Sequence, residues 1–138
     1  MTPPTLPETV ARLAEQVPSL LMHEPKQDTT LYVRGEPLFC RTYRLSYHGG
    51  WSYLHVNDER GPVCGLGLRD IEYALREEIE ARGWTVVQRI DPPSPPEKRA
   101  FAAIYFPDEL VTRKHAYADF PAHALSLALL RALERGEK

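Results

Sequence analysis

The segment AFAAIYF at residues 100–106 places the strongest constraint on how this chain can fold, because its seven residues are all apolar or aromatic. A strand with one solvated face alternates polar and apolar residues, whereas a strand covered on both faces does not. The run therefore predicts an interior strand with helices on both sides. WTVVQRI before it and RKHAYA after it are typical of further strands.

Three other segments carry apolar residues at helical spacing and predict helices at about 7–17, 68–82 and 120–135. The last segment has more leucines than one apolar stripe requires, since Leu127 and Leu130 lie outside that stripe. Either these two leucines pack under a loop of the same chain, or they form a contact between two copies. We therefore consider a homo-oligomer through Leu127 and Leu130.

A β-hairpin is expected at about 39–57, where aromatic and β-branched residues surround Gly49 and Gly50. With these glycines as the turn, Arg44 pairs with His55, and Phe39 lies on the opposite, core side. One face of the hairpin then carries Arg44, Trp51, Tyr53 and His55. Aromatic side chains beside a cation are typical of binding surfaces, so this face is the predicted ligand or partner site. The alternative is that the first helix or the tail covers it.

Length and composition favour a single domain over residues 1–138, with a loose tail at 1–6 and a proline-rich loop at 91–98. The predicted fold class is α+β, a single-domain α/β/α sandwich with a mostly antiparallel sheet. The formal net charge of -2 provides no overall attraction to nucleic acid or anionic lipid. No apolar run approaches the ~20 residues that span a bilayer, so no membrane association is expected.

The two cysteines, Cys40 and Cys64, belong to no CxxC motif, which indicates free thiols in a reducing cytoplasm. With His48 and His55 they match none of the compact zinc-ligand spacings, so we expect no metal and no cofactor. Cys64 precedes a predicted helix, whose dipole would favour a thiolate. No base with motif spacing accompanies it, so a hydrolase is the weakest hypothesis and no catalytic residue is assigned.

From RDIEYALREEIEARGWTVVQRI through KRAFAAIYF to HAYADFPAHALSLALLRAL, the chain resembles the phage ABA sandwich family of small phage and prophage proteins. The shared features are an acidic helix ending in GW, a valine-bearing strand with an alanine-rich partner strand, and a closing alanine-leucine helix. The resemblance covers about residues 68–133. It implies an α/β/α sandwich in a phage-related accessory protein located in the host cytoplasm, and it implies no catalytic residues.

These features favour a non-enzymatic, phage- or prophage-related accessory protein that binds a host macromolecule or a small signalling ligand. The alternative is a nucleic-acid-binding module that uses the aromatic and basic hairpin face. The order helix-strand-strand-strand-helix is also that of double-stranded RNA-binding domains, which place lysines at the start of the last helix. Here that position reads ADFPAHA, with an acid in place of the cations.

Overall fold

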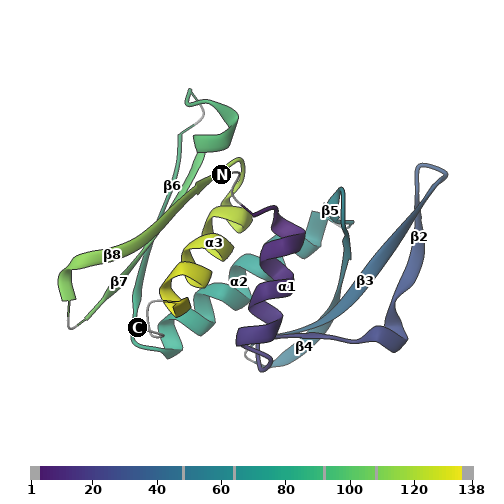
Figure 1. Ribbon diagram of the computed structural model, residues 1–138, viewed down its shortest axis with the longest axis horizontal. Helices are drawn as coiled ribbons and strands as arrows, with labels where there is room; N and C mark the ends of the chain where they lie inside the picture. The colour runs from purple at the N-terminus through teal and green to yellow at the C-terminus, as the bar shows by residue number, and fades with distance from the viewer. Residues whose placement is uncertain (1–3, 48, 64, 92, 108, 135–138) are drawn as a thin grey trace. The chain divides into compact units, whose positions relative to one another are not determined.

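The computed structural model describes residues 4–47, 49–63, 65–91, 93–107 and 109–134. This part of the chain contains three α-helices and eight strands, and all of the strand pairs are antiparallel, so the predicted α+β class is confirmed (Figure 1). The chain divides into two compact units at 1–74 and 75–138, and the division falls within α2 (Gly65–Ala81). The strands form two sheets, whereas one sheet was expected.

The first unit consists of one helix and a sheet built around a long strand. Its elements are α1 (Leu6–Gln16), β1 (Leu21–His23), β2 (Thr29–Val33), β3 (Glu36–Tyr47), β4 (Gly50–Asn57) and β5 (Gly61–Pro62), with a 3-10 turn at Pro25–Gln27. The sheet order is β1-β3-β4-β5, and β2 pairs with the first half of β3. The helix and hairpin expected here are thus present.

The start of α1 corrects the predicted tail. The Thr5 side chain accepts from the N–H of Glu8, and the Glu8 carboxylate accepts from the N–H of Thr5. This capping box fixes the first turn of the helix. Leu6 is therefore helical and buried, and the expected loose tail at 1–6 is wrong for this residue. The Thr-x-x-Glu spacing is the sequence signal that would have identified this start.

β3 changes its buried face midway along its length. Leu38 and Cys40 are buried in the first half, whereas Tyr43 and Leu45 are buried in the second half. Phe39 precedes the change and is 57% exposed, so its expected place on the core side is wrong. β1 pairs with the second half of β3, in a segment for which the sequence predicts no strand.

The second unit contains the C-terminal part of α2 and a three-stranded sheet with one helix packed on it. Its further elements are β6 (Thr85–Ile90), β7 (Ala100–Phe106), β8 (Glu109–Ala118) and α3 (Pro121–Glu134). β7 lies between β6 and β8, so the interior position of AFAAIYF is confirmed. The proline-rich segment connects β6 to β7 and includes a 3-10 turn at Pro96–Lys98.

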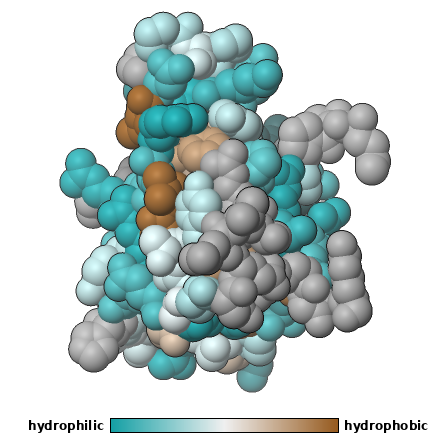
Figure 2. All heavy atoms as spheres, turned by 90° about the vertical axis from the view of Figure 1, so that its left-hand side faces the viewer, coloured by the Kyte–Doolittle hydropathy of each residue, from teal (hydrophilic) through white to brown (hydrophobic). Residues whose placement is uncertain are grey.

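The two faces of this sheet differ. α3 packs against β7 and β8, and the alternation of side chains places Ile104 on the helix side and Phe101 on the other (Figure 1). Phe101 lies between Arg89 and Tyr117, which are both exposed. The expectation of helices on both sides is therefore wrong, because long side chains of the flanking strands cover β7 on this face. Figure 2 faces this side and shows small hydrophobic areas within a mostly hydrophilic surface.

The leucines of α3 that lie outside its predicted apolar stripe are buried as well. Leu127 and Leu130 are each only 2% exposed. They are thus not on the surface, and the premise of the expected homo-oligomer contact is wrong for these side chains. Glutamate at either position would place an unpaired charge in the interior. Self-association of the chain stays a prediction, and two copies would have to contact each other through a different surface.

Within the described residues, no helix is both long enough and apolar enough to cross a bilayer.

We predict that Ile104→Asp abolishes cooperative unfolding of the second unit. Ile104 is fully buried in the central strand, so the substitution buries an unpaired charge at a cost of several kcal/mol (roughly 3–5). Thermal unfolding followed by circular dichroism measures this effect. Val87→Asp is the matched control, because Val87 lies exposed on the open face of the same sheet and should change stability little. An Ile104→Asp melt close to that of the wild type would contradict the assigned core.

Candidate functional site

The predicted hairpin exists, with a register two residues away from the expected one. Tyr47 pairs with Gly50, and Arg44 pairs with Tyr53 rather than with His55. Gly49 has a positive φ of 88°, whereas Gly50 already belongs to β4. A shift of two residues preserves the side on which each side chain lies. Arg44, Trp51, Tyr53 and His55 therefore share one face, as predicted.

This face is partly open. Trp51 and Tyr53 are 46% and 42% exposed, so neither α1 nor the described part of the tail covers them. Residues 1–3 of the expected tail lie outside the described residues. Met22 adds a further exposed side chain, because β1 places it opposite Arg44. Sequence reasoning missed Met22, since it predicts no strand in this segment. Below, the hairpin face means Met22, Arg44, Trp51 and Tyr53.

Three residues of the hairpin face contact one another. The Arg44 guanidinium lies over the Trp51 ring, with its carbon 4.4 Å from the ring centroid. The Trp51 and Tyr53 rings meet edge to face, with centroids 5.0 Å apart and planes at 67°. A cation over an indole stabilises this arrangement by about 0.5–1 kcal/mol at an exposed site. The result is an ordered aromatic surface that carries one positive charge.

His55 lies on the same side of the sheet, but its ring is engaged in a hydrogen bond. Its Nδ1 is 2.9 Å from the Thr42 Oγ1, and this hydroxyl donates its one proton to the Gln27 carbonyl at 2.7 Å. The Thr42 oxygen can thus only accept from the imidazole, which requires Nδ1 to carry a proton. His55 therefore supports the fold of the site instead of presenting Nδ1 to a ligand.

Asp28 connects the 3-10 turn to β3. Its carboxylate accepts from the Thr42 N–H at 2.8 Å and from His23 Nε2 at 3.0 Å. Burial opposes ionisation, but these two hydrogen bonds and the charges of His23 and Arg41 outweigh it and lower the pKa of Asp28 below its ordinary 3.8. Asp28 is therefore a charged anchor of the strand that carries Arg44.

The cysteines and histidines do not form a metal site in the described part of the chain. Cys40 is fully buried, and burial raises the pKa of its thiol, so it remains protonated and packs as an apolar side chain. Among the residues that the structure describes, no three His, Cys, Asp or Glu side chains are grouped closely enough to hold a metal ion. His48 and Cys64, which entered the zinc and nucleophile hypotheses, lie outside the described residues.

We predict that Asp28→Asn destabilises the first unit by about 1–2 kcal/mol at pH 7, because it replaces a charged acceptor of two hydrogen bonds. The pKa of Asp28 is lower in the folded chain than in the unfolded chain. Its stabilisation is thus present above pH ~4 and is lost as the pH falls further. Urea unfolding at pH 7 and pH 3 should give a difference between variant and wild type that shrinks at pH 3.

Asp58→Asn is the matched control for this measurement. Asp58 is 68% exposed and lies 3.7 Å from Arg41, an exposed pair of little energetic weight. A loss of stability as large as that of Asp28→Asn would contradict the special role of Asp28, as would an Asp28→Asn effect independent of pH.

The chain matches no protein-family model, no curated protein and no solved structure. The resemblance to the phage ABA sandwich family thus rests on the sequence motifs alone.

Proposed function

We propose that this chain is a non-enzymatic, phage- or prophage-related accessory protein that binds a host protein through the hairpin face. The observation that carries the proposal is the exposure of Trp51 and Tyr53 beside Arg44. Trp, Tyr and Arg are the residues most enriched at the energetic centres of protein interfaces. The phage-related part of the proposal rests on the sequence resemblance.

The contacts within the hairpin face favour a protein partner over single-stranded nucleic acid. Bases stack on flat aromatic faces along a positively charged groove. Arg44 already lies over the Trp51 ring, and Tyr53 meets that ring edge to face. Among the four residues of the hairpin face, Arg44 alone carries a positive charge. Proteins that bind nucleic acid through its phosphates use several such cations.

The support beneath the face favours binding without rearrangement. Thr42 lies on β3, two residues before Arg44. Its N–H, its hydroxyl and its carbonyl are all hydrogen-bonded, and the carbonyl accepts from the N–H of Glu24. Tyr43 and Leu45 anchor the same strand in the core on either side of Arg44. A surface ordered before binding loses less conformational entropy when the partner arrives.

We predict that Trp51→Ala abolishes retention of the host partner while the melting temperature stays within a few degrees of the wild type. Trp51 is nearly half exposed, so its removal takes away contact surface more than core packing. Immobilised wild-type and variant chains are incubated with nuclease-treated host extract, and retained proteins are quantified by mass spectrometry. Arg44→Ala should weaken retention of the same protein.

Tyr32→Ala is the matched control. Tyr32 is an aromatic residue of β2 that is 74% exposed and lies outside the hairpin face. Equal loss of retention in Tyr32→Ala and Trp51→Ala would contradict a specific site, and a collapse of stability in Trp51→Ala would assign Trp51 to the core. Proteins that are retained from untreated extract but not from nuclease-treated extract would favour the nucleic-acid alternative.

A further inference from the structure

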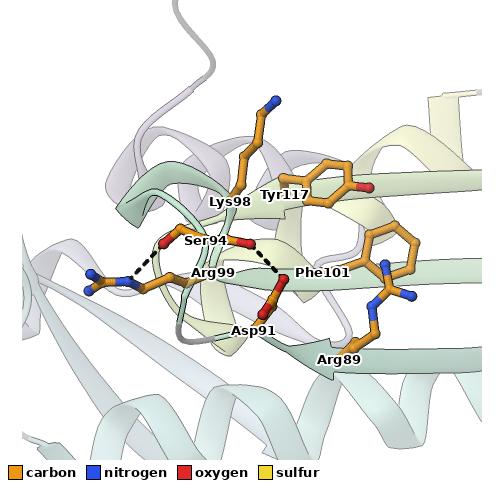
Figure 3. Close-up of a pocket in the computed structure, with 7 residues that line it drawn as sticks. All are labelled: Arg89, Asp91, Ser94, Lys98, Arg99, Phe101 and Tyr117. Atoms are coloured by element: carbon orange, nitrogen blue, oxygen red, sulfur yellow. Dashed lines mark hydrogen bonds between the residues drawn. The ribbon is translucent and has the colours of Figure 1, made fainter.

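The second unit contains a pocket of about 290 Å³ that the hairpin face does not include. The pocket lies where the proline-rich segment between β6 and β7 meets the open face of the sheet (Figure 3). The lining residues are Arg89, Asp91, Ser94, Lys98, Arg99, Phe101 and Tyr117. Three cations and one acid thus line the pocket, although the chain as a whole has a net charge of -2.

The positive charge of the pocket is not neutralised by ion pairs. Within the described residues, no carboxylate lies within 4.0 Å of the charged groups of Arg89, Lys98 or Arg99. The one acid of the lining, Asp91, accepts a hydrogen bond from the Ser94 hydroxyl at 2.6 Å. An anion entering the pocket would therefore meet uncompensated cations, which favours its binding.

The cations have different positions around the pocket. Arg89 lies along the Phe101 ring, with its guanidinium carbon 4.7 Å from the ring centroid. Lys98 extends from the 3-10 turn on the other side (Figure 3). Arg99 turns back to the loop, where its Nε donates to the Ser94 carbonyl at 3.3 Å. Arg89 and Lys98 are thus the cations best placed to meet a ligand, and Arg99 holds the loop.

Two aromatic rings form the apolar part of the pocket. The centroids of Phe101 and Tyr117 lie 5.0 Å apart, with the planes at 51°. Phe101 is buried beneath its neighbours, whereas Tyr117 is 43% exposed. Tyr117 can therefore offer part of its ring to a flat ligand. Such a contact contributes about 1–3 kcal/mol when the ligand ring is a nucleobase.

The described residues of the loop over the pocket are held by hydrogen bonds within the loop. The N–H of Asp91 donates to the Arg99 carbonyl at 2.7 Å, which closes the segment at its base. The N–H of Ser94 donates to the Asp91 carbonyl, and that of Lys98 donates to the Pro95 carbonyl. Prolines restrict the backbone between these contacts. Lys98 is thus held near the pocket before any ligand binds, which reduces the entropic cost of binding.

We propose that this pocket binds a phosphate monoester carried on an aromatic ring system, the chemistry of a mononucleotide. Arg89 would bind the phosphate, the base would lie against Tyr117, and Lys98 would add a positive charge from the opposite side of the pocket. The pocket volume is at the lower end of the ~300–1,000 Å³ typical of small-ligand sites, which favours one nucleotide over a dinucleotide. The proposal is independent of the hairpin face, since none of its residues belongs to that surface.

Isothermal titration of the full chain with adenosine monophosphate tests the proposal. We expect saturable binding that Arg89→Gln weakens about 10-fold, the effect of losing one hydrogen bond to a charged group. Lys98→Gln should weaken it by a smaller factor, because it removes a nearby charge. Tyr117→Ala should weaken it by a similar factor, because it removes the stacking surface. Inorganic phosphate and adenosine, each lacking one half of the ligand, should both bind more weakly than the nucleotide.

Arg12→Gln and Lys26→Gln serve as charge-matched controls, since both cations are exposed and neither lines the pocket. Thermal melts establish that each variant is folded. Absence of saturable binding by the wild type at millimolar nucleotide would overturn the proposal, as would equal weakening by the control variants. Phosphate binding as tightly as the nucleotide would overturn the aromatic part of the assignment. Tighter binding of a single-stranded oligonucleotide, with the same dependence on Arg89, would overturn the mononucleotide class.

Discussion

The hydrogen bonds of Thr42 are the interaction on which the first unit depends. Its N–H, carbonyl and hydroxyl bind Asp28, Glu24 and Gln27, so one residue of β3 holds the whole connection between β1 and β2. This residue is fully buried at the point where β3 changes its buried face. A buried polar residue costs free energy unless its groups are paired, and here each of them is paired. The orientation of Arg44 two residues later follows from this anchor.

The sequence was sufficient to predict that Arg44, Trp51 and Tyr53 lie on one side of the hairpin, but not which residues pair. Alternation along a strand has a period of two, so any register that differs by two residues yields the same face. The partner of each residue depends on which glycine occupies the positive-φ position of the turn. Gly49 occupies it and Gly50 does not. Composition cannot distinguish two adjacent glycines.

The open face of β7 differs from its pattern for a different reason. An unbroken apolar run predicts a helix on each side, yet exposed side chains of β6 and β8 cover the open face of β7. Arg89 shields the Phe101 ring, because an arginine covers apolar surface with its stem while its charged end stays in water. The pocket beside Phe101 was not predictable either. It is formed by residues of three strands and a loop that are brought together only by the antiparallel register.

The interface between α3 and its sheet is built largely from alanine, with Ala102 and Ala116 paired on adjacent strands and Ala128 fully buried on the helix. Side chains this small let a helix approach a sheet closely, and a close-packed interior has no room to spare. Larger apolar residues at these positions cost about 1–3 kcal/mol each, although they conserve hydrophobicity. Mutational tolerance of this unit is therefore asymmetric. Exposed positions of its open face outside the pocket can vary widely, whereas the alanines of its interior admit little beyond glycine or serine.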